Sequence, residues 1–449
     1  MQKLQDTIVA PSTPAGVSAI AVVRMSGAEA LQIISKCFSK NLEKVDGYTL
    51  HYGFIQDENT RIDEVLVSVF RTPHSYTGEN SVEISSHGSP YIVKRIMEVL
   101  LKCGARMADP GEFTLRAFLN KKLDLAQAEA VADMIHSNSE AGLQMAISQM
   151  RGGFSNDISA LRQELIDFAA LIELENDFGE EDVELANRPQ LEQLVEKLLV
   201  QIEKLKASFA AGNVLKNGIS TVIAGKPNAG KSTLLNALLN EERAIVSDIA
   251  GTTRDTIEEV FTLNGVQFRL IDTAGLRESD DTIEQIGVGK AKQQMEKAEL
   301  LIYLHAPSSQ QTVAEVISEW NRLPQVKHKL LVLNKIDATH IDKSDWPTET
   351  LFISAKTGNI ESLTQKLTEI AANYQFGNET IVNNVRHAEA LGNSATALQA
   401  VLDGLNTGIS SDLVALDIRN ALYHLGLITG EVTNEDVLDS IFSRFCIGK

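Results

Sequence analysis

The chain has 449 residues, more than one hydrophobic core usually holds, so we expect two or three domains. Hydrophobic residues make up 43% and charged residues 22%, a balance typical of globular proteins. No run of about 18 uncharged apolar residues predicts a membrane span. The formal charge of −19 argues against extensive non-specific nucleic-acid binding, which depends on clustered lysine and arginine, but it does not exclude a local basic patch.

The first residues and the cysteines bear on the compartment. The start, MQKLQDTIVAPS, has neither the apolar core of a secretory signal nor the Arg/Ser-rich pattern of a transit peptide. Cys37, Cys103 and Cys446 are odd in number and widely spaced, which predicts no disulfide framework and no CxxC metal pair. We therefore expect a cytoplasmic protein that does not associate with membranes.

Residues 1–118 combine strand and helix patterns. VSAIAVVRMSG, DEVLVSVF and SVEISS resemble strands, and the helical pattern PYIVKRIMEVLLKCG follows the turn HGS. We predict an α+β N-terminal domain over this range.

From about residue 120 the chain becomes helical, and apolar residues of the later part recur at helical spacing: Leu191, Leu194, Val195, Leu198, Leu199, Ile202 and Leu205. The acidic stretch ELENDFGEEDVE is interpreted as a solvated loop or helix end rather than a metal site. AAGNVLKNG resembles a linker, strands and helices alternate from 219 to about 375, and 385–449 is helical again. We predict an all-α helical domain, residues 119–214 and 380–449, interrupted by an inserted α/β domain, residues 215–379.

The segment GKPNAGKS, residues 225–232, matches the G-x-x-x-x-G-K-[ST] loop that binds nucleotide phosphates. It lies between the strand pattern STVIAG and the helical pattern STLLNALL, as this loop requires. Gly225 and Gly230 allow backbone N–H groups to face phosphate oxygens at the positive end of a helix. Lys231 is predicted to neutralise the β and γ phosphates during catalysis, and the Ser232 hydroxyl to bind Mg²⁺.

Three further motifs follow in the order of a guanine-nucleotide domain. Asp272, in RLIDTAG, is predicted to hold the second shell of the metal, and the Gly275 N–H to face the γ-phosphate. In LLVLNKID, the Asp337 carboxylate can accept hydrogen bonds from the ring N–H and the amino group of guanine. Adenine lacks this donor pair, at a cost of about 1–3 kcal/mol or more. LFISAK supplies a backbone contact to the guanine oxygen, so we predict a GTP site.

Between the first two motifs, the Asn264-Gly265 pair predicts a hairpin, and therefore one antiparallel strand in an otherwise parallel sheet. This is the layout of a Ras-like P-loop G domain. The predicted nucleotide-binding residues are Asn228, Ala229, Gly230, Lys231, Ser232, Thr233, Ser247, Asp248, Ile249, Ala250, Gly251, Thr252, Thr253, Asp272, Thr273, Ala274, Gly275, Asn334, Lys335, Asp337, Ser354, Ala355 and Lys356.

The residue after DTAG, where Ras-type enzymes place a glutamine that orients water, is Leu276. An apolar side chain cannot align water, so another group must. Glu284 is the predicted catalytic acid, with Asp280 and Asp281 as rivals and a solvated surface acid as the alternative.

The loop VSDIAGTTRDT, residues 246–256, suggests a second cation. Thr253 is predicted to supply the second Mg²⁺ hydroxyl. Asn228, with the backbone carbonyls of Ser247, Ile249 and Thr252, is predicted to form an oxygen cage for K⁺ beside the phosphates. A cation there would stabilise charge that develops between the β and γ phosphates, so we predict potassium-dependent hydrolysis.

The motifs GKPNAGKS, DIAGTTRDT, DTAGLRE, NKID and SAK, inside a helical domain and ahead of FCIGK, closely resemble the MnmE/TrmE family of bacterial tRNA modification GTPases. DTIVAPSTPAG and GEFTLRAFLNKKLDLAQAEAVADMI also fit, so the resemblance covers essentially the whole chain. It implies a homodimer, a heterotetramer with the flavoprotein MnmG (GidA), and tRNA as substrate. The implied reaction adds an aminomethyl or carboxymethylaminomethyl group to carbon 5 of the wobble uridine.

The resemblance also implies a tetrahydrofolate site in the N-terminal domain, with 5-formyltetrahydrofolate or another tetrahydrofolate derivative as the carbon carrier. By position in the family motifs, Arg24, Glu83, Lys122 and Lys449 would contact it. An ordinary salt bridge is the alternative for each. Ser247 stands where many relatives have threonine, a change that a carbonyl ligand tolerates.

Cys446 lies in the closing FSRFCIGK, which has three interpretations. Lys449 is an unusual last residue for a prenylation box, and TNEDVLDSIFSRF predicts a capped amphipathic helix, which argues against a frayed tail. We therefore predict a thiol that a docked helix holds at or near the folate site.

Two rival functions stay open at this point. An Era-type RNA-binding ribosome-assembly switch would need a basic KH-like domain with a G-x-x-G loop, whereas the flanking regions here are helical and acidic. A structural or signalling dimer that only hydrolyses GTP would not bind folate.

Overall fold

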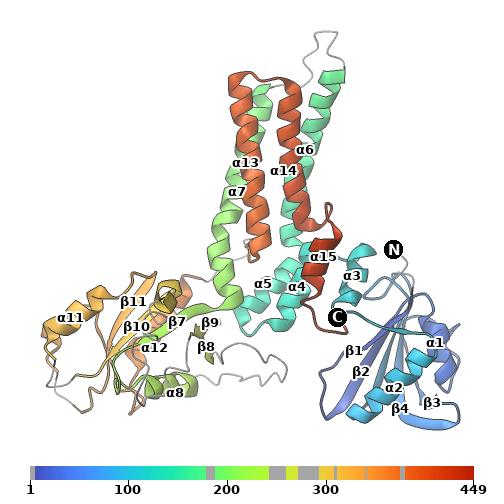
Figure 1. Ribbon diagram of the computed structural model, residues 1–449, viewed down its shortest axis with the longest axis horizontal. Coiled ribbons are helices and arrows are strands. Elements are labelled where there is room, and N and C mark those ends of the chain that lie inside the picture. The colour runs from blue at the N-terminus through green and yellow to red at the C-terminus, as the bar shows by residue number, and fades with distance from the viewer. Residues whose placement is uncertain are drawn as a thin grey trace. The chain divides into compact units, whose positions relative to one another are not determined.

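The computed structural model contains two compact units, which are described separately (Figure 1). The first comprises Met1–Ala132, Gln149–Val195 and Thr396–Lys449, and the second Asp133–Ser148 and Glu196–Ala395. The structure describes residues 6–177, 188–241, 259–271, 293–307, 311–338, 341–374 and 380–449. Within these residues no helix is both long and apolar enough to cross a membrane. The fold is multidomain, as predicted.

The first unit contains a six-stranded sheet in the order β3-β4-β5-β2-β1-β6, antiparallel except where β1 pairs with β6. The strands are β1 (Ile8–Pro11), β2 (Ser18–Ser26), β3 (Thr49–Asp57), β4 (Thr60–Phe70), β5 (Ser81–Gly88) and β6 (Arg106–Met107). Helices α1 (Ala30–Cys37) and α2 (Pro90–Lys102) cover one face. Val23, Met25 and Ile84 point into this core, so their strand neighbours Arg24 and Glu83 lie on the opposite face.

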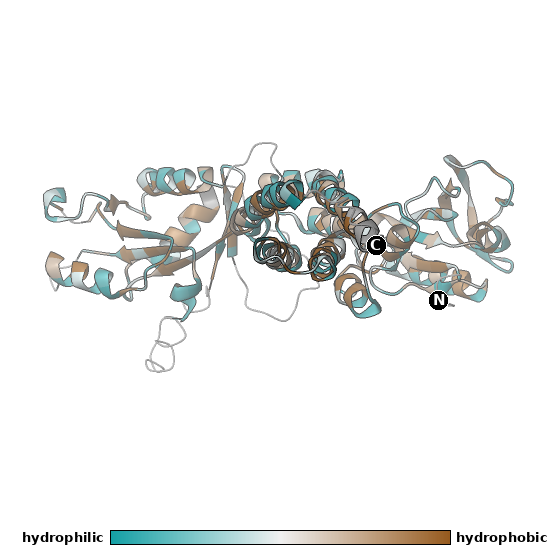
Figure 2. Ribbon diagram, turned by 90° about the horizontal axis from the view of Figure 1, so that it is seen from above, coloured by the Kyte–Doolittle hydropathy of each residue, from teal (hydrophilic) through white to brown (hydrophobic). Residues whose placement is uncertain are grey.

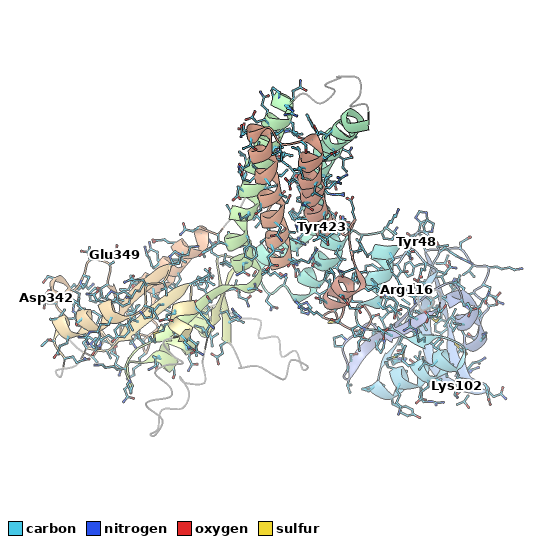
Figure 3. All side chains as sticks on the ribbon, turned by 45° about the horizontal axis from the view of Figure 1, so that its top comes forward. Tyr48, Lys102, Arg116, Asp342, Glu349 and Tyr423 are labelled. Atoms are coloured by element: carbon cyan, nitrogen blue, oxygen red, sulfur yellow. The ribbon has the colours of Figure 1, made fainter. Side chains whose placement is uncertain are left out.

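A buried ion-pair network joins the start of the described chain to α3 (Glu112–Leu119). Arg116, labelled in Figure 3, is 1% exposed and donates to the Asp6 carboxylate at 2.7 Å and to Glu112 at 3.0 Å. Arg106 donates to the same Glu112 oxygen at 2.6 Å. Because these charges are paired, they hold this helix in place without a burial penalty for an isolated ion.

The remaining helices include long antiparallel pairs, of which α6 and α14 pack side by side in the first unit. Figure 2 shows helices with one hydrophobic and one hydrophilic side. On α14 the buried side consists of Val414, Ala415, Ile418, Ala421 and Leu425. The helices are α4 (Leu125–His136), α5 (Glu140–Met150), α6 (Gly153–Asp177), α7 (Arg188–Asn217), α13 (Val385–Thr407), α14 (Ser411–Thr429) and α15 (Glu435–Phe442).

Helix α15 confirms the capped amphipathic helix predicted near the end of the chain. The Asn434 side chain accepts a hydrogen bond from the Val437 N–H at 2.9 Å. Phe442 and Phe445 are buried against Leu125 and Ala128 of α4. A Cβ at Gly111, before α3, would lie 2.5 Å from the Phe442 carbonyl oxygen, so glycine permits this close packing. The segment after Phe445 therefore begins at a residue whose position is fixed by packing against α4.

The second unit contains the predicted mostly parallel sheet, in the order β12-β11-β10-β7-β9-β8. Only β8 is antiparallel, and Asn264 and Gly265 of its hairpin with β9 both have positive φ, 51° and 76°. The predicted hairpin is confirmed. The strands are β7 (Ile219–Ala224), β8 (Glu259–Leu263), β9 (Val266–Leu270), β10 (Leu300–His305), β11 (His328–Leu333) and β12 (Leu351–Phe352).

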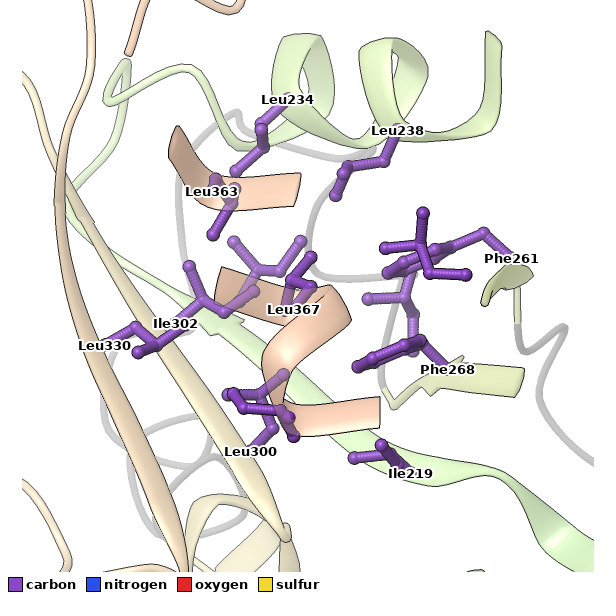
Figure 4. Close-up of a cluster of buried hydrophobic side chains, with 14 of the residues drawn as sticks. Ile219, Leu234, Leu238, Phe261, Phe268, Leu300, Ile302, Leu330, Leu363 and Leu367 are labelled. Carbon is purple, nitrogen blue, oxygen red and sulfur yellow. The ribbon is translucent and has the colours of Figure 1, made fainter. Parts of the chain in front are cut away.

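Helices cover both faces of this sheet. Leu234 of α8 (Lys231–Glu241) and Leu367 of α12 (Glu361–Ala372) belong to one core cluster, where the Phe261 and Phe268 rings stack at 5.0 Å (Figure 4). On the other face, Val316 of α11 (Val313–Arg322) packs with other apolar side chains of the strands. This three-layer arrangement leaves the carboxyl ends of the parallel strands open to the loops that follow them.

The linker predicted at AAGNVLKNG is wrong, because residues 210–217 form the last turns of α7 and only Gly218 lies beyond its end. Val214 and Leu215 are buried in the core of the second unit, which supplies a packing reason for helix there. Gly212 lies against the returning chain, since a Cβ on it would be 2.1 Å from the Val382 carbonyl oxygen. The Asp133 carboxylate binds Lys216, near the end of α7, at 2.7 Å, and accepts a hydrogen bond from Asn383, before α13, at 3.1 Å. It therefore holds these two segments beside each other.

Candidate functional site

The phosphate-binding loop runs from the end of β7 to the start of α8. Gly225, Asn228 and Gly230 have positive φ of 154°, 62° and 97°. A Cβ at Gly225 would lie 2.2 Å from the Leu304 carbonyl oxygen, and one at Gly230 would lie 2.3 Å from Asn334 Nδ2. Only glycine fits at these two positions, and the loop delivers the chain to the positive end of α8.

Lys231 opens α8 and is held by its own loop. Its Nζ donates to the Gly225 carbonyl at 2.9 Å and to the Lys226 carbonyl at 3.1 Å. Burial lowers the pKa of this amine. Since phosphate oxygens can replace both carbonyls and carry charge, an anion would be favoured here. Ser232 and Thr233 follow in the first helical turn and are exposed, so the Ser232 hydroxyl suits a Mg²⁺ ion bound beside the phosphates.

Asn334 joins the phosphate loop to the other motifs. Its Nδ2 donates to the Ala229 carbonyl at 2.9 Å, and its Oδ1 accepts from the Ala355 N–H at 2.9 Å. Lys335 reaches back to the Asn228 carbonyl at 2.7 Å. Residues 225–233, 334–337 and 354–356 therefore lie together as one candidate nucleotide site, although they are far apart in the chain.

Asp337, the residue predicted to bind guanine, lies beside Ser354. Its carboxylate accepts a hydrogen bond from the Ser354 hydroxyl at 2.6 Å, and this bond is the main cause that holds the pKa of Asp337 below its usual value. The group is therefore an ionised acceptor at neutral pH. Lys356, which follows Ala355, is exposed on the same loop.

The described residues do not include 242–258 and 272–292, the ranges before and after the β8–β9 hairpin. The other residues named for GTP binding and hydrolysis lie in these two ranges. These residues are Ser247, Asp248, Ile249, Ala250, Gly251, Thr252, Thr253, Asp272, Thr273, Ala274, Gly275, Leu276, Asp280, Asp281 and Glu284.

A second polar site lies on the sheet face of the first unit opposite α1 and α2. Arg24 and Glu83 are register partners on β2 and β5, and the arginine donates through Nε at 3.0 Å and Nη2 at 2.8 Å to Glu83 Oε1. Arg24 Nη1 faces the Gly448 carbonyl at 3.5 Å. Tyr76 and Phe113 place their rings 5.3 and 5.8 Å from the guanidinium carbon.

The segment Cys446–Lys449 docks beside this pair. Gly448 has a φ of 93°, and a Cβ on it would lie 2.2 Å from the Pro11 carbonyl oxygen. The Ser12 hydroxyl donates to the Gly448 carbonyl at 3.3 Å, and the Lys449 N–H to the Cys446 carbonyl at 3.2 Å. These bonds close a turn against β1 and the residue after it.

Lys449 and Cys446 complete the site electrostatically. Burial and then Arg24 lower the pKa of the Lys449 amine, while Cys446 and Glu83 act in the opposite direction. Cys446 itself is exposed. We name Arg24, Glu83, Cys446 and Lys449 the Arg24 cluster. Its carboxylate can accept hydrogen bonds from an N–H edge of a ligand, and its two cations can bind an anionic group beside that edge.

Lys122, the other residue that the resemblance placed at a folate site, follows α3 and lies against the loop that contains Pro73 and Gly78. Its Nζ donates to the Pro73 carbonyl at 3.2 Å. Sequence reasoning did not single out Tyr76, Phe113, Ser12 or Gly448. No spacing could have found them, because they come from four separate segments that only the fold brings together.

The glycine loop, its link to NKID and SAK, and the mostly parallel sheet define a P-loop protein of the guanine-nucleotide-binding class. Two family models match the chain, "GTP-binding protein TrmE N-terminus" over residues 7–122 and "MnmE helical domain" over residues 125–446. The chain belongs to the MnmE family of tRNA modification GTPases, as the motifs indicated.

Curated relatives support this assignment over the full length. The tRNA modification GTPase MnmE of Christiangramia forsetii is 50% identical and covers 100% of both chains. The protein of the same name from Cytophaga hutchinsonii is 52% identical and covers 99% of this chain and 98% of its own. Among solved structures, the G domain of the T. maritima FeoB iron transporter matches 34% of this chain and 98% of its own, with 27% identity and a TM-score of 0.25.

Proposed function

We propose that this chain hydrolyses GTP and, with the flavoprotein MnmG, adds an aminomethyl or carboxymethylaminomethyl group to carbon 5 of the wobble uridine of tRNA, using a tetrahydrofolate one-carbon donor. One observation carries the proposal. A single chain brings its phosphate-loop, NKID and SAK segments into contact and holds, on a different sheet, a charged cluster beside an exposed thiol. A GTPase switch alone has no need of the second site.

At the nucleotide site, each described residue has a distinct task. Lys231 exchanges its two loop carbonyls for the β and γ phosphates, and Ser232 holds Mg²⁺, which neutralises phosphate charge. Asp337 accepts two hydrogen bonds from guanine in place of the one from Ser354. Glu284 orients the attacking water in the absence of a glutamine after DTAG.

We further propose that K⁺ completes the hydrolytic machinery. Asn228 stands in a left-handed turn of the phosphate loop, and Lys335 already binds its backbone carbonyl, so the side-chain oxygen is the atom left for a cation. The predicted carbonyl donors come from Ser247, Ile249 and Thr252. Replacing potassium by sodium at constant ionic strength should lower kcat for GTP by at least about tenfold. Equal kcat in the two salts would refute this.

The Arg24 cluster suits a tetrahydrofolate derivative. When bound, the derivative would supply the one-carbon group that it carries. Glu83 accepts from ring N–H groups beside Lys449, and Lys122 is the cation proposed for the carboxylates of the ligand. Arg24 orients Glu83 and the Gly448 carbonyl at the same time. Cys446 offers its thiol beside the carbon carrier.

The proposal includes a homodimer formed through the N-terminal domain. The sheet face opposite α1 and α2 exposes four large apolar side chains, with exposed fractions of 63%, 61%, 54% and 41%: Ile20, Leu50, Tyr52 and Leu66. The register places Tyr52 beside Leu66, so the patch is continuous across β3 and β4. Apolar surface of this kind is typical of an interface between copies. The domain division would be 1–118 for folate binding and dimerisation, 119–214 with 380–449 for the helical domain, and 215–379 for the G domain.

The decisive experiment is mass spectrometry of tRNA nucleosides from cells that lack this gene. We expect the carboxymethylaminomethyl or aminomethyl wobble uridine to disappear, and to return when the intact gene is supplied. An unchanged nucleoside profile would contradict the proposal and favour the Era-type switch, for which ribosome-subunit profiles would then be the measurement.

A further inference from the structure

We propose that Tyr76 is a positioning residue of the Arg24 cluster, and that its ring keeps the Cys446–Lys449 turn docked by holding Arg24. The inference rests on the proposed function only in the identity of the ligand, a tetrahydrofolate derivative. It concerns a residue that no sequence motif singles out.

The guanidinium of Arg24 is fixed in two directions. In its plane, Nε and Nη2 bind Glu83 at 3.0 and 2.8 Å, and Nη1 faces the Gly448 carbonyl at 3.5 Å. The guanidinium carbon also lies over two aromatic rings, 5.3 Å from the centre of Tyr76 and 5.8 Å from the centre of Phe113. An aromatic ring attracts the flat face of arginine and leaves the N–H groups at its edge free for acceptors.

Tyr76 is itself held independently of any ligand. Its hydroxyl shares a hydrogen bond of 2.8 Å with Thr114, which is fully buried on α3. Its ring packs on a small core that contains Ile8, Ala10 and Phe113. Burial raises the pKa of the phenol, so the ring stays neutral. The ring is therefore a rigid support for the arginine.

The turn depends on the arginine through one carbonyl. Arg24 and the Ser12 hydroxyl converge on the Gly448 oxygen, at 3.5 and 3.3 Å. When Arg24 loses the Tyr76 ring, the nearer of its two aromatic neighbours, its rotamers multiply and the longer of the two contacts with the Gly448 oxygen is lost first. Lys449 and Cys446, which lie one residue after and two residues before Gly448, then lose their fixed position relative to Glu83.

The test uses the full-length protein and three variants at one position. Tyr76→Leu and Tyr76→Met delete the ring, and the second keeps most of the buried volume. Tyr76→Phe keeps the ring and deletes the hydroxyl. Tyr91→Leu is the matched control, because Tyr91 is 71% exposed on α2, a helix of the opposite sheet face.

Two measurements are made on each protein. Calorimetric titration with 5-formyltetrahydrofolate should give about tenfold weaker binding for Tyr76→Leu and Tyr76→Met, and binding within about twofold of the parent for Tyr76→Phe and Tyr91→Leu. Hydrogen–deuterium exchange of the peptide that contains 446–449 should be faster in the two ring-deleted variants without any ligand. Tyr76→Phe should melt at a lower temperature, since Thr114 loses its partner, and still bind.

The results separate three outcomes. Normal exchange and binding in both ring-deleted variants would overturn the inference, as would a Tyr76→Phe protein that binds as poorly as Tyr76→Leu. If the parent protein binds no folate, the proposed ligand is wrong, and the exchange of 446–449 alone decides the role of Tyr76. Should Tyr76→Leu fail to fold, Tyr76→Met carries the test.

Discussion

In the nucleotide site, Lys231 donates to carbonyls five and six residues away, and Asp337 is paired with Ser354, 17 residues away. In the Arg24 cluster, the partners of Arg24 are Glu83 and Gly448, which are 59 and 424 residues away. The first site is built from loops that follow strands of one sheet, and Asn334 and Lys335 contact the phosphate loop 105 and 107 residues earlier. The second exists only when segments from both ends of the chain are folded together.

The difference has a consequence for mutation. A nucleotide site whose loops all follow strands of one sheet should fail mainly when a group that binds the ligand is removed. A composite site should fail whenever any of its segments is displaced, even by a residue that touches no ligand. Substitutions in the two sites should therefore separate GTP turnover from folate binding.

The largest effect is expected from Lys231→Ala. This change removes the ammonium that is proposed to bind phosphate oxygens in place of the two loop carbonyls. The value of kcat/KM for GTP should therefore fall by about 100- to 1,000-fold. Phosphate-release kinetics measure this. Folate binding should be unchanged, and a Lys231→Ala protein with more than a tenth of the parent activity would contradict the assigned role. Lys366→Ala, in an exposed ion pair on α12, is the control.

Asp337→Asn sharpens the assignment of the base. The amide can accept only one hydrogen bond from guanine and turns a donor toward the other N–H group, so affinity for GTP should fall by about 100-fold. Xanthosine triphosphate, which presents an acceptor there, should bind better than GTP. Competition against a labelled GTP analogue measures both, and an unchanged preference for guanine would remove Asp337 from base recognition. Ser354→Ala is a milder comparison, since it deletes only the group that pairs with Asp337.

Glu112→Gln tests the ion pairs that hold α3, the helix that carries Phe113 beside the Arg24 cluster. Burial raises the pKa of Glu112, but hydrogen bonds from Arg106, the Asp109 N–H and Arg116 outweigh it and hold the pKa below the usual 4.5. A carboxyl whose pKa is lower in the folded chain than in the unfolded chain stabilises the fold at pH values above its unfolded-state pKa. This contribution is lost as the pH falls through the folded-state pKa.

We therefore expect Glu112→Gln to lower the free energy of unfolding by about 2–3 kcal/mol at pH 7, and to flatten the loss of stability below about pH 4.5. Denaturant titrations at a series of pH values give both quantities. Parallel stability curves for the two proteins at acid pH would show that Glu112 keeps an ordinary pKa in the folded chain.

Gly448→Ala should have the smallest effect and the most selective one. The added Cβ would meet the Pro11 carbonyl at 2.2 Å, in a φ of 93° that L-residues rarely adopt. We expect about tenfold weaker 5-formyltetrahydrofolate binding and normal GTP turnover. Gly358→Ala is a matched control, because Gly358 also has a positive φ, of 79°, and nothing lies within 4 Å of its Cβ position. Tight folate binding by Gly448→Ala would show that the turn need not dock.

The contrast also explains what the sequence could predict. The phosphate loop, the hairpin at Asn264-Gly265 and the capped helix at Asn434 are local patterns, and the structure contains all three elements. The linker prediction failed at Val214 and Leu215, because glycine and asparagine around them suggested a break while tertiary burial favours helix. Propensity is a weak guide where packing decides.

For the Arg24 cluster, the sequence offered no periodicity or spacing. Arg24, Glu83 and Lys449 could be named only from a family resemblance, and Tyr76 and Phe113 not at all. Contacts over 59 and 424 residues arise from strand pairing and from the docking of α15, which single-sequence patterns do not encode.

The central claim is that one chain couples GTP hydrolysis to carbon transfer at a separate thiol-bearing site. The most direct test is to supply Cys446→Ser to cells that lack the gene, and to measure both tRNA nucleosides and the GTP turnover of the purified variant. The account predicts normal turnover and no modified wobble uridine. Full modification by Cys446→Ser would contradict it.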